Sequence, residues 1–159
     1  MRFTLLLIFL TLTLNATTYK FDELRYVKAV LVEFKKTGTM FMDDKSICIT
    51  YDAPKYQKVT SSEDGVTIDN GDGKVQKLEG RALQYTKVYL ELVRELDDIN
   101  NYKNNRDFSV EKEQNIYTLY PKGEMSYKIE KIEIDTKNDQ VKSFKMHMSN
   151  EDIITIVKK

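Results

Sequence analysis

The sequence predicts an α+β protein, built from an antiparallel sheet of short strands and one helix. Apolar and polar residues alternate from Ile47 to Tyr51, which is the period-2 pattern of a half-buried strand. Pro54 interrupts this run, because proline has no amide N–H to donate to a sheet. More short runs of this kind follow along the chain, and only residues 81–100 show a long helical period.

The N-terminal residues resemble a secretory signal peptide. Arg2 supplies one positive charge, residues 3–14 are apolar apart from three threonines, and Ala16 is a small residue suited to cleavage. This apolar stretch is shorter than the roughly 20 residues that a membrane-spanning helix needs. We therefore expect residues 1–16 to be removed on export, and residues 17–159 to form a single domain in the bacterial periplasm.

Charge and cysteine content argue against several kinds of partner. The chain has 25 Lys and Arg against 25 Asp and Glu, so its net charge is close to zero. A neutral chain has no electrostatic basis for binding nucleic acid or an anionic membrane. Cys48 is the only cysteine, so no disulfide can form within the chain. We expect a monomer that depends on its apolar core for stability.

The segment before Ile47 is ambiguous. Leu24, Val27 and Leu31 fall at helical spacing, whereas the β-branched residues after Val27 favour a strand. The predicted elements are a short N-terminal helix or extended arm, a strand over residues 29–36, a turn at 37–39, a strand from residue 40 to 42 and a turn at 43–46.

Strands and turns alternate between residues 55 and 80. The run DNGDG at residues 69–73 is typical of a tight hairpin that needs positive φ angles. The predicted strands are residues 55–61, 66–68 and 75–78, with a loop at 61–65.

Residues 81–100 are predicted to form the one helix. Apolar residues repeat along one side at helical spacing, and charged residues occupy the other side. The asparagine-rich residues 100–105 are expected to end the helix as a polar loop. The apolar stripe consists of Leu83, Val88, Leu92, Leu96 and Ile99, widened by Tyr85, Tyr89 and Val93.

The second half of the chain returns to strands. One of them changes parity, since Tyr127 and Ile129 share a face whereas Ile132 and Ile134 lie on the opposite one. Such a switch predicts a β-bulge, of the kind that curved sheets need. The predicted strands are residues 107–111, 114–120, 126–135, 141–148 and 152–157, with turns at 121–123 and 137–139.

Residues suited to catalysis or metal binding are scarce. His147 is the only histidine, which removes histidine-based metal clusters and leaves a catalytic triad without a base. The sequence contains no glycine-rich phosphate loop and no nucleophile elbow. Residues 69–73 lack the spacing and the closing glutamate of a calcium loop. We expect a non-enzymatic protein without metal or cofactor, whose candidate functional residues are apolar.

Three stretches carry a family resemblance. Residues 38–59, GTMFMDDKSICITYDAPKYQKV, contain a glycine, a strand, a turn, and a strand that ends in an aromatic residue and a proline. Residues 108–123, FSVEKEQNIYTLYPKG, form a hairpin that ends in Leu-x-Pro-Lys, and IEKIEIDTKNDQVKSFKM follows as another. In this order they resemble the LolA family of periplasmic lipoprotein carriers, over about residues 30–158.

This resemblance implies an unclosed, curved antiparallel β-barrel with the helix covering its concave face. It also implies reversible binding of acyl chains, from lipoproteins or other lipids, in an apolar cavity beneath a moving helix, for transfer toward the outer membrane. The implied partners are an inner-membrane lipoprotein-release transporter and an outer-membrane acceptor. The residues that would line the cavity are Phe34, Met40, Met42, Ile47, Ile49, Tyr51, Leu92 and Leu96.

The chain departs from the family pattern at two places. Lipoprotein carriers of this family have an Arg-Pro after the first long strand and a tryptophan in the next, where this chain has Asp44, Lys45 and Ile49. Two hypotheses therefore stay open. One is a carrier with a lipid cavity, and the other is a structural or interaction module of the envelope whose cavity is filled by its own side chains.

Overall fold

The computed structural model describes residues 16–103 and 105–159, so all of the predicted signal peptide except Ala16 lies outside the described residues. Eleven strands form one sheet in which every neighbouring pair is antiparallel. The first half holds β1 (Thr17–Val27), β2 (Val32–Met42), β3 (Ile47–Ala53), β4 (Gln57–Ser62), β5 (Gly65–Asp69) and β6 (Val75–Lys77). The second half holds β7 (Phe108–Glu113), β8 (Ile116–Pro121), β9 (Ile129–Lys137), β10 (Gln140–Met148) and β11 (Ile153–Lys158).

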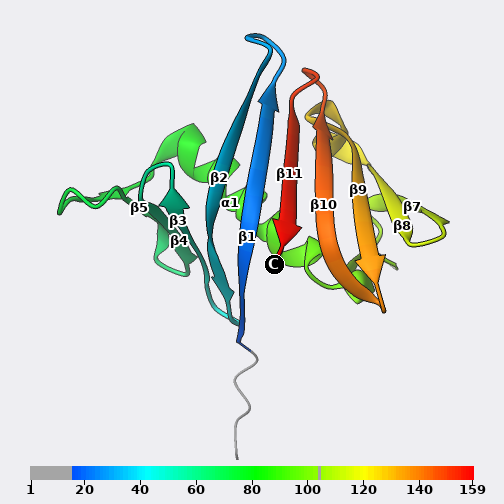
Figure 1. Cartoon of the computed structure of the whole chain (residues 1–159), viewed down its shortest axis with the longest axis horizontal. Helices are drawn as coiled ribbons and strands as arrows, with labels where there is room; N and C mark the ends of the chain where they lie inside the picture. The colour runs from blue at the N-terminus through cyan, green and yellow to red at the C-terminus, as the bar shows by residue number, and fades with distance from the viewer. Residues whose placement is uncertain (1–15, 104) are drawn as a thin grey trace, which may run out of the picture.

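The sheet is open, with the order β6-β5-β4-β3-β2-β1-β11-β10-β9-β8-β7. The first and last strands, β1 and β11, pair with each other in the centre of the sheet, and the strands on either side follow as meanders. The edge strands β6 and β7 are joined by α1 (Gly80–Leu96) and α2 (Ile99–Lys103), so the helices cross one face of the sheet (Figure 1). The predicted α+β class is confirmed: a curved, unclosed antiparallel sheet with a helix on its concave face.

Side-chain alternation places the core between the sheet and α1. On β2 and β3, Met40, Met42, Ile47 and Ile49 are buried while the residues between them are more exposed. Buried residues of α1 face them from the other side of the core. The core is therefore a single apolar layer, made by one face of the sheet and one side of the helix.

Of the two forms predicted for the N-terminal segment, the helix is wrong and the extended arm is closer to the structure, because residues 17–27 form a strand. β1 pairs with β2 along its whole length, without a register shift, and with β11 on its other side. Pairing on both sides satisfies the backbone hydrogen bonds of this segment as a strand. The contacts with β2 and β11 therefore outweigh the local helical spacing of its apolar residues. The predicted turn at residues 37–39 is also wrong, since Gly38 lies inside β2.

The turn between β1 and β2 falls instead at residues 28–31, where the sequence offers no glycine, asparagine or proline. It is closed by backbone hydrogen bonds from Val30 N to Val27 O and from Leu31 N to Lys28 O, both 3.3 Å long. Leu31 adopts a φ of 54° and is 70% exposed. A left-handed backbone costs a leucine about 1–2 kcal/mol relative to glycine, which explains why the sequence did not predict this turn.

The predicted helix ends earlier than expected. α1 stops at Leu96, and α2 begins at Ile99, so the predicted loop at residues 100–105 is partly helical. The Asp98 carboxylate accepts a hydrogen bond from the Asn100 amide N–H, at 2.9 Å, and thereby caps the new helix.

The predicted bulge in the second half is confirmed. His147 pairs with Lys131 and Met148 pairs with Ile129, so Glu130 has no partner in β10 and the register shifts. Tyr127, however, belongs to a short 3-10 helix, η1 (Gly123–Tyr127), rather than to the strand. The bulge explains why the apolar parity of this segment changes.

Gly38 allows β2 and β3 to approach closely. A Cβ at this position would lie 2.2 Å from the carbonyl oxygen of Thr50, which belongs to the backbone of β3. The register between the two strands skips Asp52 here, because Thr37 pairs with Ala53 and Gly38 with Tyr51. Only glycine fits this bulged crossing without moving a strand.

We predict that Gly38→Ala lowers the free energy of unfolding by about 1–3 kcal/mol, the usual cost of overpacking. The neighbouring substitution Thr39→Ala is the control, because the Thr39 side chain is only half-buried and points to the other side of β2. Chemical denaturation of both variants measures the difference. Equal stability of the two variants would contradict the close approach.

Candidate functional site

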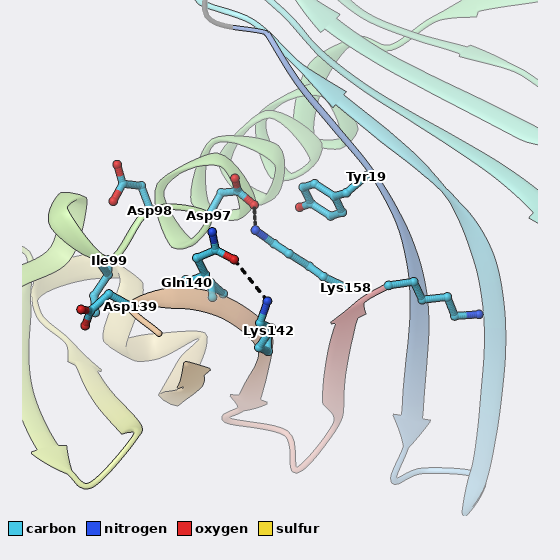
Figure 2. Close-up of a pocket in the computed structure, with 10 residues that line it drawn as sticks. Tyr19, Asp97, Asp98, Ile99, Asp139, Gln140, Lys142 and Lys158 are labelled. Carbon is cyan, nitrogen blue, oxygen red and sulfur yellow. Dashed lines mark hydrogen bonds and ion pairs between the residues drawn. The ribbon is translucent and has the colours of Figure 1, made fainter. Parts of the chain in front are cut away.

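The C-terminal half of α1 is held firmly against the sheet. Its buried residues are all found here: Leu90, Leu92, Val93 and Leu96. Just after the helix, the Asp97 carboxylate forms an ion pair with Lys158 of β11, and the two side chains are only 16% and 17% exposed. The Lys158 ammonium also lies 4.4 Å from the centre of the Tyr19 ring (Figure 2). Apolar burial and a shielded ion pair thus fix this end of the helix.

A polar hollow of about 380 Å³ adjoins this ion pair (Figure 2). Its walls carry Asp97, Asp139 and Lys142 from different elements. The Tyr19 hydroxyl donates a hydrogen bond to the Met40 sulfur at 3.0 Å. Burial, and then the Asp97 carboxylate, raises the pKa of Tyr19 above its usual value. Charged walls of both signs make this hollow unsuitable for an acyl chain.

The N-terminal half of α1 stands away from the sheet. No residue of this helix before Leu90 is buried. Tyr85 is 60% exposed and Val88 is 53% exposed, so their predicted place in the buried stripe is wrong. Leu83, Thr86 and Tyr89 are the half-buried positions of this half. The helix is therefore anchored at one end only.

An apolar groove of about 330 Å³ lies beneath this N-terminal half. It runs between α1 and the concave side of β1 to β5 and reaches Ile154 of β11. Its apolar lining consists of Ile49, Tyr51, Val59, Ile68, Tyr85, Tyr89, Leu90 and Ile154, and its polar lining of Arg25, Lys36, Gln57 and Thr86.

The structure distributes the residues predicted to line a cavity over three places. Ile49 and Tyr51 line the groove. Phe34 is 51% exposed and lies outside the groove, beside the adjoining charged residues of β1 and β2. The others are packed in the core: Met40, Met42, Ile47, Leu92 and Leu96.

Several groove residues were not predicted. Val59 and Ile68 lie at alternating positions of predicted strands, so strand periodicity alone could have placed them on the concave face. Ile154 and Arg25 reach the groove through the pairing of β1 with β11. This pairing joins the two ends of the chain, and no local pattern in the sequence indicates it.

A buried polar cluster lies at one end of the groove. The Tyr51 hydroxyl donates a hydrogen bond of 2.7 Å to Glu23, whose side chain is 1% exposed. The other carboxylate oxygen of Glu23 lies 3.2 Å from the Arg25 guanidinium. The Lys36 ammonium lies over the Tyr51 ring, 4.4 Å from its centre. Burial raises the pKa of Tyr51, and the neighbouring Tyr89 and Glu23 raise it further.

Three buried polar atoms of this cluster are incompletely paired. Arg25 Nε, the Tyr89 hydroxyl and Glu23 Oε1 make no well-formed hydrogen bond with the described residues. Burial, and then the Glu23 carboxylate, raises the pKa of Tyr89, whereas Arg25 acts in the opposite direction. A buried polar group without a partner costs stability, so these atoms can gain hydrogen bonds from a ligand or from water.

The convex face carries a separate cluster of charges. His147 Nε2 lies 2.9 Å from one Glu133 oxygen, and Lys131 lies 2.7 Å from the other. Lys131, and then His147, lowers the pKa of Glu133. His147 therefore points away from its methionine neighbours and pairs with Glu133. Within the described ranges, no group of three or more His, Cys, Asp or Glu side chains is arranged to hold a metal ion.

The departure from the family pattern near Lys45 has a structural role here. The Asp43 carboxylate accepts hydrogen bonds from the amide N–H groups of Lys45 and Ser46, at 2.9 and 2.7 Å. These bonds lower the pKa of Asp43 and close the turn between β2 and β3. Lys45 itself lies outside the groove lining.

Comparisons with known proteins assign the chain to no family. No known family matches the sequence, and no curated protein matches it. A crystal structure of a DUF1329 family protein from Desulfovibrio piger is similar over 92% of this chain and 85% of that chain, at 8% sequence identity and a TM-score of 0.43. The fold and site define an open antiparallel sheet with a groove beneath a helix, and LolA membership remains a prediction.

Among the described helices, none has the length and apolar character needed to cross a membrane.

We predict that Lys158→Met lowers the free energy of unfolding by about 1–3 kcal/mol, because the shielded Asp97 carboxylate loses its partner. Amide hydrogen exchange should also become faster at the C-terminal end of α1. Lys159→Met is the control, because the Lys159 side chain is 52% exposed and its partner Asp22 keeps a second ion pair with Lys35, so its loss should contribute little. Unchanged exchange in α1 of the Lys158 variant would show that the ion pair does not anchor the helix.

Proposed function

We propose that this protein is a non-enzymatic carrier that binds the acyl chains of lipids or lipoproteins reversibly beneath the N-terminal half of α1. One observation carries this proposal: the helix is fixed at its C-terminal end and stands over an apolar groove at the other. A groove with apolar side chains from β3, β4, β5 and α1 and a polar cluster at one end matches the shape of an amphiphile. Its volume of about 330 Å³ is within the range of small-molecule sites.

The N-terminal end of α1 is suited to act as a lid. The residue before the helix, Glu79, makes no side-chain capping hydrogen bond, and both Glu79 and Gly80 are exposed. Outward movement of this half would therefore break few contacts, while the buried residues from Leu90 onward keep the helix in place. Such a movement would lengthen the groove for a longer chain.

Export and transfer complete the proposal. After removal of residues 1–16, the carrier would work in the periplasm, between an inner-membrane lipoprotein-release transporter and an outer-membrane acceptor. The intact mass of the protein isolated from its native compartment tests this part. A mass equal to that of residues 17–159 supports export, whereas the mass of a chain that still carries Met1 contradicts it.

The alternative function, a structural or interaction module without cargo, also has support. Met40, Leu96 and Ile132 are fully shielded from solvent, so much of the concave face is already filled by the protein's own side chains. A packed interior of this kind needs no ligand for stability. Ligand binding decides between the two functions.

We predict that Thr86→Trp abolishes binding of an uncharged fluorescent ligand such as phenylnaphthylamine, because the indole fills the groove from the half-buried face of α1. Gln84→Trp is the matched control, since Gln84 is exposed on the same helix and is absent from the groove lining. Fluorescence titration measures both, and equal binding by the two variants would place the ligand elsewhere.

Displacement of this ligand by fatty alcohols of increasing length tests the carrier more directly. Each buried methylene contributes about 0.8 kcal/mol, so the affinity should rise about fourfold per methylene until the groove is full. A plateau at short length indicates a rigid groove, and a continued rise indicates that α1 moves. Absence of displacement at every length would overturn the carrier and leave the module without cargo.

A further inference from the structure

We infer that the groove selects amphiphiles with an anionic head group, which binds at the cluster of Arg25, Lys36 and Tyr89. This inference rests on the proposed function and adds the class of ligand. The shared chemistry is a carboxylate or phosphate group on a single acyl or alkyl chain. Its basis is the arrangement of hydrogen-bond donors around one end of the groove.

Donor groups of three side chains converge at this end of the groove. Arg25 Nε and the Tyr89 hydroxyl are buried and make no well-formed hydrogen bond with the described residues, and the same holds for Oε1 of the neighbouring Glu23. Lys36 lies beside the Tyr51 ring, and none of its carboxylate neighbours in the described chain comes within ion-pair distance. All three side chains belong to the groove lining. A ligand that satisfies them must present acceptors, as an anionic head group does.

The acidic residue of the cluster is already engaged. Glu23 accepts the hydrogen bond from Tyr51 and forms the ion pair with Arg25, so its negative charge is offset by one positive charge. Lys36 then leaves an excess of one positive charge at this end of the groove. Because the site is partly shielded from water, this charge interacts more strongly with an anion than it would on an open surface.

The position of the cluster orients the ligand. Arg25 and Lys36 lie on the concave sides of β1 and β2, near the exposed Phe34, whereas Val59 and Ile68 line the groove farther along the sheet on β4 and β5. An anionic head would therefore remain near the open end of the groove, with partial access to water. The chain would extend across β3 toward β5, beneath Tyr85 and Leu90 of α1.

Calorimetric titration of the mature chain with a fatty acid, an alkyl phosphate and a fatty alcohol of equal length tests this inference. We expect the two anions to bind at least about tenfold more tightly than the alcohol, which is the usual gain from charge-assisted hydrogen bonds. The tighter of the two anions identifies the head group as a carboxylate or a phosphate.

Lys36→Met should weaken binding of the anions about tenfold and binding of the alcohol much less. Lys35→Met is the matched control, because Lys35 is next to it on β2 but pairs with Asp22, 3.4 Å away, and is absent from the groove lining. Equal losses in the two lysine variants would indicate a general effect of charge and would overturn the specific site.

Tyr89→Phe separates the ligand-binding role from a structural role. Removal of a buried hydroxyl without a partner should leave the melting temperature unchanged or raise it. The same substitution should weaken binding of the anions severalfold. A lower melting temperature together with unchanged anion binding would show that the hydroxyl serves the fold, and would overturn its part in the site.

Different results would overturn the proposed carrier function and the inferred selection for an anionic head group. If alcohol and anions bind equally well to the unmodified chain, selection for an anionic head group is wrong and the carrier stands. If neither the alcohol nor the anions bind, the carrier function is wrong, and the inferred selection for an anionic head group is then wrong as well.

Discussion

The connection between the two edges of the sheet is the constraint on which the rest of this structure depends. β6 and β7 are the outermost strands, and they are neighbours in the order of strands along the chain, so the segment between them must cross the whole sheet. One face of that sheet is apolar and needs a cover. α1 provides both the crossing and the cover, and for this reason a single long helix suffices for eleven strands.

The uneven burial of α1 follows from the same geometry. Its C-terminal half lies over the centre of the sheet, where β1 and β11 meet, and there Lys158 reaches Asp97. Its N-terminal half follows the short edge strand β6, which is exposed along its length. No residue of α1 before Leu90 is buried, so this half packs less closely and leaves the groove open. The proposed function depends on this difference between the two halves of one helix.

The polar end of the groove shows a balance between stability and function. Glu23 is buried in an apolar environment, and it is tolerated because Tyr51 and Arg25 satisfy its charge. The unpartnered hydroxyl of Tyr89 has no such compensation within the described chain. Groups that cost stability in the free protein are often those that contact a ligand, because binding removes the cost. We interpret this cluster in that sense.

Local periodicity was enough to predict most strands, the main helix and the bulge near Glu130, because alternation and helical spacing are properties of neighbouring residues. It left β1 undecided between a helix and an extended arm, and pairing with β2 and β11 decides for a strand. The family resemblance implied that Met40, Met42 and Ile47 line a cavity on the concave face, whereas they belong to the packed core. Neither resemblance nor periodicity could tell packed core from open groove. The sequence by itself determined which residues are apolar and which face each strand buries. Tertiary structure alone decided where α1 rests, and therefore which apolar residues border a groove, since that depends on contacts between segments far apart in the chain.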